Sequence, residues 1–305
     1  MPEADDITRK AKSNLAFALM DLPDLKRKRM AQFYAFCRIV DDIVDEPGLT
    51  SEERHAALDR WIEVIDLAAE PHAGIESEVQ ELVREMKLDT APMKQLIEGC
   101  RSDITPVQPA TRRELMAYTY RVASCVGITS AAVMGASPAA HDYAVALGHA
   151  LQFVNIIRDV AEDATKYGRI YLPANDMEIF GVSVEDLFSK RSTFRVRHLL
   201  AYEAALAENF FSEADERYAR LSVPDRNALI PAQAMSLIYH TILEKMRADE
   251  YRIFEKRYSV NNVRKLWFLL RARIDTVEIP SLPSLPTFPS LSDWGLFNKD
   301  DKKHQ

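Results

Sequence analysis

Apolar residues recur at intervals of three and four positions over most of this chain, which is the spacing of one face of an α-helix. The period-two alternation of half-buried strands is almost absent, and glycine is scarce, with nine in 305 residues. The pattern predicts an all-α fold. The expected helices cover residues 6–20, 24–45, 51–69, 75–86, 91–102, 112–134, 141–163, 194–219, 225–256 and 261–273, with a loop through Pro173.

Proline and glycine limit most of these helices, as at Pro47 and Gly48 after the second one. Pro231 and Gly127 instead fall inside helical patterns, where we expect kinks or close backbone approaches. No long linker and no internal repeat divides the chain. We therefore predict a single helical-bundle domain over residues 1–276.

Residues 277–305 differ from the rest of the chain. Proline recurs between Ile279 and Pro289, which excludes a regular helix and predicts an extended tail. Its apolar residues, including Phe288 and Trp294, could dock on the helical body, on a partner or on a membrane surface.

Composition narrows the classes of protein. With 47% hydrophobic residues the chain can bury a sizeable core, and a net charge of −7 argues against nucleic acid as a partner. The acidic N-terminus lacks the apolar segment of a secretory signal, and no apolar run reaches membrane-spanning length. Three cysteines without CxxC spacing favour a reducing, cytoplasmic location.

Two acidic runs carry the candidate chemistry. Asp41 and Asp45 lie four residues apart, as do Asn155, Asp159 and Asp163, so each set shares one helix face. Like charges at this spacing repel each other, and the runs are flanked by apolar residues, so a cation is needed nearby. We predict that these five residues bind Mg²⁺, with Mn²⁺ as the alternative ion, together with substrate phosphates.

Arg38 and Arg158 accompany the two runs, and guanidinium is well suited to bind phosphate oxygens. Acids and arginines around a helical cavity favour metal-assisted departure of diphosphate, with an apolar pocket that shelters a carbocation. A solvated, salt-bridged helix face is the competing interpretation of either run alone. Two such runs favour the metal site.

The motifs resemble those of the squalene/phytoene synthase family, the head-to-head prenyl transferases. Residues 33–46, FYAFCRIVDDIVDE, are similar to its first aspartate motif, and residues 147–163, LGHALQFVNIIRDVAED, to its second. The segments GRIYLP at 168–173 and YTYRVASCVG at 118–127 also resemble family segments. The resemblance covers about residues 8–273 and implies an isoprenoid-synthase-type helical bundle with a central active-site cavity.

The resemblance also implies roles for residues and a reaction. Catalytic roles fall on Asp41, Asp45, Tyr118, Asp159 and Asp163. The residues implied to bind substrate are Ser13, Asn14, Arg38, Arg121, Gln152, Asn155, Arg158, Arg169 and Tyr171. The implied reaction condenses two allylic prenyl diphosphates, expected to be farnesyl diphosphate, to presqualene diphosphate or squalene with release of diphosphate. NADPH is required only if the reaction continues to squalene.

Two positions bear on this resemblance. The family often has a Ser-x-Ser-Phe-like stretch on its first helix, whereas this chain has Lys12-Ser13-Asn14-Leu15, which leaves the diphosphate contacts there open. At Arg121 the chain resembles bacterial presqualene diphosphate and phytoene synthases, in which arginine is usual, more than eukaryotic squalene synthases, in which an aromatic residue is.

Several functions stay open at this stage. Phytoene synthesis from geranylgeranyl diphosphate would use the same motifs. A class I terpene cyclase shares the metal-ligand spacing, and a non-catalytic assembly factor could share the fold. The products of the family are water-insoluble hydrocarbons, so peripheral membrane contact is expected, whereas the sequence predicts no oligomeric state.

Overall fold

The computed structural model describes residues 3–11, 14–19 and 22–276, and these residues form helices and connecting segments without any strand. The all-α prediction is confirmed. The helices are α1 (Glu3–Ala11), α2 (Asn14–Ala18), α3 (Asp24–Asp45), α4 (Ser51–Ile65), α5 (Ile75–Met86), α6 (Ala91–Ser102), α7 (Arg112–Thr119), the π-helical turn η2 (Tyr120–Ser124), α8 (Cys125–Met134), the 3₁₀ turn η3 (Pro138–Ala140), α9 (His141–Tyr167), α10 (Ala174–Phe180), α11 (Val184–Phe188), α12 (Phe194–Ala219), α13 (Val223–Ala228), α14 (Ile230–Ala248) and α15 (Asn262–Ile274).

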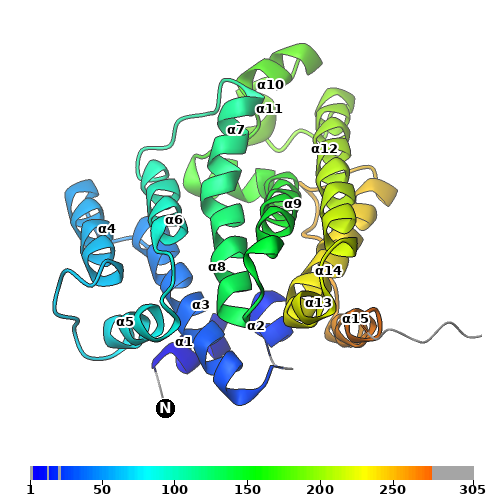
Figure 1. The fold of residues 1–305 in the computed structure, drawn as a ribbon. Coiled ribbons are helices and arrows are strands. Elements are labelled where there is room, and N and C mark those ends of the chain that lie inside the picture. Colours follow the sequence, from blue (N-terminus) through cyan, green and yellow to red (C-terminus); the bar gives the residue numbers. More distant parts are fainter. Residues whose placement is uncertain (1–2, 12–13, 20–21, 277–305) are drawn as a thin grey trace, which may run out of the picture.

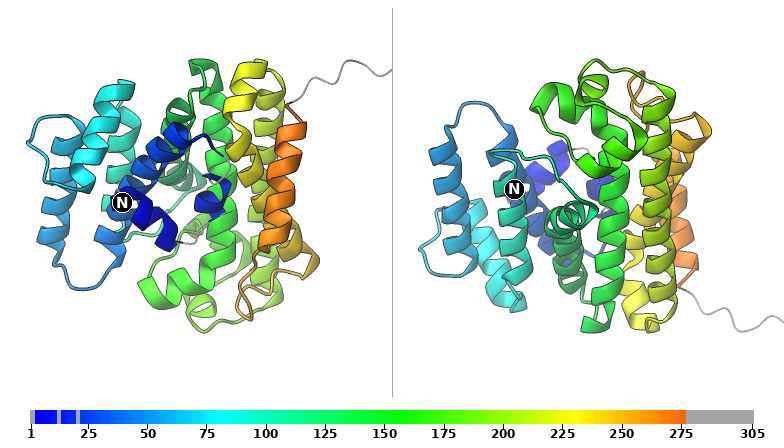
Figure 2. Two further views of the ribbon diagram at one scale, coloured as in Figure 1. Left: turned by 90° about the horizontal axis from the view of Figure 1, so that it is seen from below. Right: turned by 90° about the horizontal axis from the view of Figure 1, so that it is seen from above.

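Helix α9 is the central element of the bundle. It packs against α7, η2 and α8 on one side and against α12 and α14 on the other. Helices α3 to α6 form one flank of the molecule, and α12 to α15 form the opposite flank (Figures 1 and 2). The two predicted acidic helices, α3 and α9, therefore belong to neighbouring layers of one bundle.

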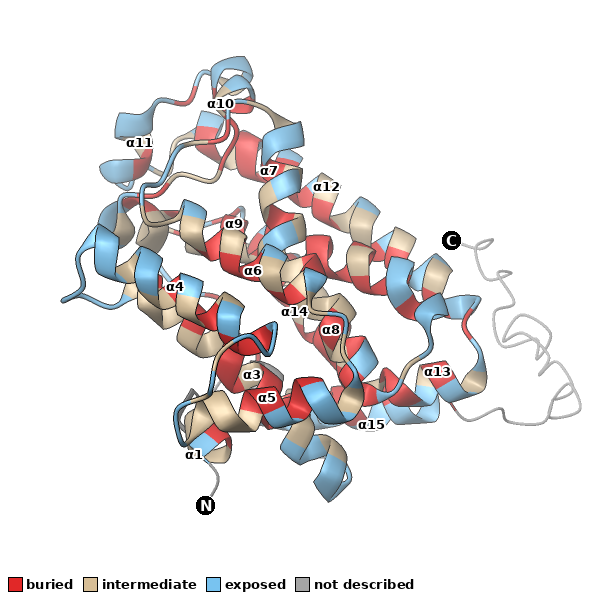
Figure 3. Cartoon of the chain, turned by 60° about the vertical axis from the view of Figure 1, so that its left-hand side comes forward, coloured by how far each residue is buried: buried red, intermediate tan, exposed pale blue. Residues whose placement is uncertain are grey.

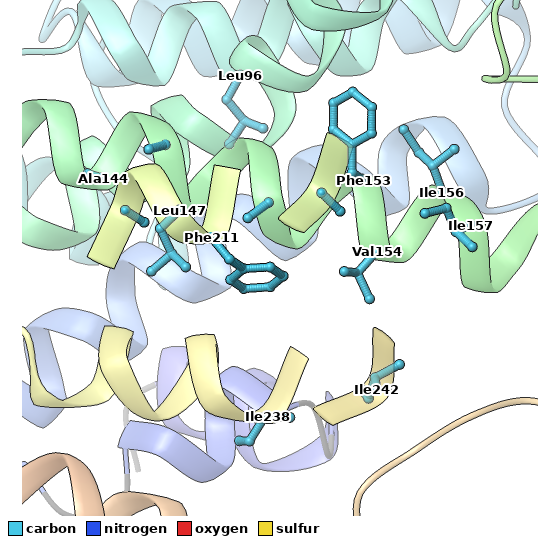
Figure 4. Packing of buried hydrophobic residues seen from close by; sticks show 14 of the residues in the cluster. Leu96, Ala144, Leu147, Phe153, Val154, Ile156, Ile157, Phe211, Ile238 and Ile242 are labelled. Carbon is cyan, nitrogen blue, oxygen red and sulfur yellow. The ribbon is translucent and has the colours of Figure 1, made fainter. Parts of the chain in front are cut away.

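The core lies along the inner faces of these helices. Val154 of α9 points toward α14, which carries Ile238 and Ile242, and Phe211 of α12 belongs to the same buried cluster (Figure 4). Buried residues follow the inward side of each helix and exposed residues the outward side (Figure 3). The apolar spacing in the sequence thus marks the packed faces.

The helix limits confirm part of the sequence prediction. Helices α3, α5, α6 and α12 have the predicted bounds. The single helix expected over 6–20 is wrong, since α1 and α2 are separate, and α4 ends at Ile65 rather than at residue 69. The predicted loop around Pro173 contains α10 and α11, and α9 continues to Tyr167. The proposed tail, residues 277–305, lies outside the described residues, so the domain boundary at 276 stays a prediction.

Pro231 does not kink a helix as predicted. The expected helix over 225–256 is instead two helices, α13 and α14, with Leu229 between them. Pro231 lies in the first turn of α14, where a helix needs no N–H donor and the fixed φ of proline suits the start of a helix. The proline therefore begins α14.

Gly127 confirms the predicted close backbone approach. A Cβ atom added to Gly127 would lie 2.9 Å from the main-chain oxygen of Ala144, and one added to Gly148 would lie 2.4 Å from Cα of Ser124. Helix α9 thus lies directly against η2 and α8. The side chains that follow on α9 face a cavity at this junction.

Candidate active site

Two adjoining cavities lie where α3, η2, α8, α9 and α14 meet. The mouth cavity, about 410 Å³, is lined by Asn14, Tyr34, Cys37, Arg38, Asp41, Leu96, Cys100, Asp103, Tyr118, Val122, Val126, Gln152, Asn155, Met235 and Tyr239. The inner cavity, about 220 Å³, is mainly apolar, and Leu19, Met30, Met134, Tyr143 and Leu147 are among its lining residues. The two share Val122, Val126, Gln152, Asn155, Met235 and Tyr239. A polar entrance therefore adjoins an apolar interior.

The first acidic run lies at the mouth cavity on α3. Arg38 pairs with Asp41 at 3.1 Å and with Asp42 at 2.5 Å, which matches their i,i+3 and i,i+4 spacing on the helix. Burial, and then the nearby Asp45 carboxylate, raise the pKa of Asp41 to about 6. The carboxylates of α3 form the first wall of the site, and Arg38 only partly balances their negative charge.

The second acidic run lies on α9. Arg158 donates to both carboxylate oxygens of Asp159, at 2.9 and 2.5 Å, and Arg257 approaches the same carboxylate at 3.3 Å. Burial, and then the Asp159 charge, raise the pKa of Asp163 to about 7. These α9 side chains form the second wall of the site, where two arginines lie beside a pair of carboxylates that repel each other.

Arg169 lies between the two walls. Helix α9 ends at Gly168, whose φ of 66° allows the chain to turn back, so the Arg169 N–H donates to the main-chain oxygen of Asp163 at 2.9 Å. Its buried guanidinium pairs with Asp45 at 2.6 Å and donates to the main-chain oxygen of Asp103 at 3.2 Å. Its charge opposes the rise that burial and neighbouring carboxylates cause in the pKa of Asp41 and of Asp163, which lie on separate helices. The cation thus links α3 and α9.

Tyr118 and Tyr171 form a second link within the site. Their rings stack at 4.8 Å with an interplanar angle of 21°, and the Tyr118 hydroxyl donates to the Asp103 carboxylate at 2.8 Å. Burial raises the pKa of Tyr118 well above its usual value, so its hydroxyl stays a neutral donor. Asp103 also lines the mouth cavity.

Only some of the remaining predicted residues line the cavities. Gln152 and Asn155 line both cavities, and the Asn155 amide donates to the Gln152 Oε1 atom at 3.3 Å. Asn14 lines the mouth cavity, whereas Ser13 lies outside the described residues. Arg121 is exposed on η2 and lines neither cavity. The two cavity linings also exclude Asp45, Arg158, Asp159, Asp163, Arg169 and Tyr171, of which Asp163, Arg169 and Tyr171 line a separate small pocket.

The donors suit a divalent cation that is shared with a ligand. Among residues 3–11, 14–19 and 22–276, no three His, Cys, Asp or Glu side chains are grouped to hold one ion. Each wall instead offers a carboxylate pair, and the buried Oδ1 of Asn155 lacks a hydrogen-bond partner. Mg²⁺ is commonly held by one or two carboxylates plus substrate phosphates and water, and this donor set fits that mode.

The polar or charged residues of the site that the sequence did not predict include Asp103, Tyr239 and Arg257. Tyr239 lines both cavities, and its ring lies 6.0 Å from the Arg158 guanidinium carbon. None of the three belongs to either of the two acidic runs that carried the prediction. An exposed arginine next to a tyrosine, as in Arg257-Tyr258, gives no local sign of a contact with α9.

Comparison with known proteins agrees with this geometry. The fold and the two acid-bearing helices define an isoprenoid-synthase-type helical enzyme, similar to the solved structure of a dehydrosqualene synthase. That similarity has a TM-score of 0.77 at 29% identity and covers 89% of this chain and 94% of that one. The family model for squalene/phytoene synthase matches residues 8–264. The chain belongs to the squalene/phytoene synthase family.

Two further relatives have informative names. Squalene synthase HpnC from Alicyclobacillus acidocaldarius has a TM-score of 0.72 at 28% identity, covering 81% of this chain and 93% of that one. A chloroplastic phytoene synthase from an Oncidium hybrid cultivar is 34% identical over 250 residues, covering 79% of this chain. This chain spans 60% of the length of that relative.

The members of the family are prenyltransferases that act on prenyl diphosphates, generally with a divalent metal. None of the helices that the structure describes has the length and apolar character needed to cross a membrane.

Proposed function

We propose that this protein joins two allylic prenyl diphosphates head to head, with farnesyl diphosphate as the substrate, to form presqualene diphosphate or squalene and release diphosphate. One observation carries the proposal: a polar mouth cavity, lined by Arg38, Asp41 and Asp103, adjoins an apolar inner cavity. The second acidic run lies on α9, whose Gln152 and Asn155 line both cavities. An amphipathic substrate with a diphosphate at one end and a hydrocarbon chain at the other matches this division.

Side chains on the two walls bind the diphosphate groups and the metal ion. Arg38 and Arg158 bind diphosphate oxygens, and Asp41, Asp45, Asn155, Asp159 and Asp163 would hold Mg²⁺ together with those oxygens. The metal, when bound, supplies charge that stabilises the departing diphosphate. The carbon–oxygen bond of one substrate breaks, and the double bond of the second attacks the resulting allylic cation. Loss of a proton then closes the cyclopropane ring.

The remaining residues position and shelter the reacting carbons. Apolar side chains of the inner cavity exclude water, which would otherwise capture the cation. Tyr118, held by Asp103 and Tyr171, lines the mouth cavity that adjoins the apolar part. Aromatic faces attract cations, so this position suits stabilisation of positive charge on the substrate.

Phytoene synthesis from geranylgeranyl diphosphate is the second candidate, because several curated relatives are named phytoene synthase. The bulky Met30, Met134 and Tyr143 along the inner cavity support the shorter chain. We therefore expect farnesyl diphosphate to be consumed faster than geranylgeranyl diphosphate.

The test is to incubate the purified protein and Mg²⁺ with each diphosphate, with and without NADPH, and to identify the products by mass spectrometry. Presqualene diphosphate without NADPH supports the proposal, and squalene with NADPH shows that the reaction continues. Phytoene from the longer substrate alone would reverse the order of the two candidates. A cyclic hydrocarbon made from one substrate molecule would contradict both.

A further inference from the structure

Helix α15 carries an exposed apolar stripe. Its members are Val263, Leu266, Trp267, Leu270 and Ile274, each of which keeps between 50% and 81% of its surface exposed. At 100° per residue they fall within an arc of about 100° and extend about 16 Å along the helix. Such a contiguous apolar surface on a soluble body marks a site of interaction.

The opposite face of α15 packs against the rest of the protein. Leu269 and Ala272 pack with Ala234 and Met235 of α14 in a small buried cluster, and Phe268 joins the main core. Helix α15 lies at the outer edge of the molecule, beyond α13 and α14 (Figures 1 and 2). The stripe therefore faces outward on a helix held rigidly by its inner face.

Basic residues flank the stripe. Arg264 and Arg271 lie on one side of the arc and Arg273 on the other, and all three are exposed. With Lys265, the thirteen residues of α15 carry four basic residues and no acid, in a chain of net charge −7. Apolar side chains, a tryptophan and flanking arginines on one helix face match the interface of an anionic bilayer.

We propose that α15 binds peripherally to anionic lipid bilayers, with Leu266, Trp267 and Leu270 inserted at the interface and the arginines on lipid phosphates. The proposal does not depend on which prenyl diphosphate reacts. A second copy of the chain fits less well, because a two-fold contact would bring the same cationic flanks together. Residues 277–305 also fit less well, since their four acids and three lysines leave little charge to complement α15.

A side pocket of about 220 Å³ next to α15 supports bilayer contact through this helix. It is bounded by Leu269 and Arg273 of α15, by Leu22, and by Pro231 of α14. Pro231 also lines the inner cavity, so the wall of the apolar cavity lies next to this pocket. Binding through α15 would place that wall near lipid, which is a favourable arrangement for apolar substrates and products.

The test is vesicle co-sedimentation of the full chain, with phosphatidylcholine alone and with phosphatidylcholine that contains phosphatidylglycerol. We expect binding only to the anionic vesicles and loss of that binding in the triple variant Leu266→Ser, Trp267→Ser and Leu270→Ser. The matched control is Val107→Ser with Ile179→Ser, which removes exposed apolar side chains elsewhere, at 83% and 76% exposure. Unchanged Tm values will show that both variants fold.

Charge and the competing occupants are tested in the same assay. Arg264→Gln and Arg271→Gln should each weaken binding about fivefold, which is the change that about 1 kcal/mol per basic residue gives, whereas Arg220→Gln should not. Equal binding of the triple variant and the parent chain would overturn the proposal. So would binding that persists in the triple variant but disappears when the chain ends after Thr276. Self-association that the triple variant abolishes, without any vesicle binding, would instead identify a second copy as the occupant.

Discussion

Asp41 and Asp159 serve the proposed reaction through charge, since each lies beside an arginine and another carboxylate on its own wall. Replacing Asp41 or Asp159 with asparagine keeps the shape and removes one metal-binding oxygen anion. We expect product formation to fall at least about 100-fold, as for other groups that stabilise charge in a transition state. Because the change also relieves repulsion between carboxylates, Tm should stay within a few degrees of the parent value.

The measurement combines product formation at saturating Mg²⁺ with thermal unfolding. Asp142→Asn is the matched control, because Asp142 is an exposed acid in the first turn of the same helix as Asp159 that pairs with Arg217 rather than with any predicted ligand. Full turnover by either aspartate variant would rule out the metal assignment.

Tyr118 and Asp103 should act as one unit. The Tyr118 hydroxyl donates to the Asp103 carboxylate, and this bond fixes the stacked pair with Tyr171. We predict that Tyr118→Phe and Asp103→Asn each lower kcat about tenfold, with little change in KM, and that the double variant is no slower than the slower single variant. Steady-state kinetics of the four proteins form a double-mutant cycle. Effects that multiply in the double variant would show that the two residues act independently.

The π-helical turn η2 depends on glycine at its contact with α9. A Cβ on Gly148 would lie 2.4 Å from the Ser124 Cα atom, and rigid backbone cannot move away as a flexible side chain can. Gly148→Ala should therefore lower the free energy of unfolding by about 3 kcal/mol. Gly127→Ala, where the nearest atom lies at 2.9 Å, should have a smaller effect. Urea denaturation gives both values, and a Gly148→Ala protein as stable as the parent would contradict this packing.

A buried carboxyl links α7, α10 and α12. Glu203 is 1% exposed and lies 3.5 Å from Arg112, which also pairs with Asp176 at 2.6 Å. Burial raises the pKa of the Glu203 carboxyl from its ordinary value of 4.5 to about 7. Because the folded state retains the proton longer, this group's contribution to stability is largest below pH 4.5 and is lost as the pH rises to about 7.

We predict that Glu203→Gln gains stability relative to the parent as the pH increases from 5 to 8, by up to about 3 kcal/mol. Arg112 keeps Asp176 as its partner in this variant. Urea denaturation across that pH range measures the difference, with the exposed Glu216→Gln as control. A constant difference between Glu203→Gln and the parent would show that Glu203 does not titrate in this range.

The helices and the acidic walls could be predicted because their causes are local. Apolar spacing defines α3 and α12, and repulsion between aspartates four residues apart is visible in the sequence itself. The turn η2 could not be predicted, since it depends on contacts with glycines of α6 and α9. Asp103 and Arg257 reach the site only through tertiary folding, and Arg121 shows that membership of a motif does not place a side chain in the cavity.

The arrangement of acids over the entire bundle leads to a prediction about ligand binding. Carboxylate pairs on α3 and α9 are linked by Arg169, and no three metal-ligating side chains within the described residues form a complete ion site. Diphosphate oxygens are therefore needed to complete the coordination of Mg²⁺. We expect Mg²⁺ alone or inorganic diphosphate alone to change Tm little, and both together to stabilise the fold by about 3 kcal/mol at concentrations near 100 times Kd.

Thermal unfolding monitored by fluorescence checks this with four samples: no ligand, each ligand alone and both together. The Asp41→Asn and Asp159→Asn proteins should lose most of the joint shift, whereas Asp142→Asn should retain it. A large shift with Mg²⁺ alone would mean that the protein supplies a complete metal site. A large shift with diphosphate alone would mean that Arg38, Arg158 and Arg169 bind the anion without a metal, so that the acidic walls have another role.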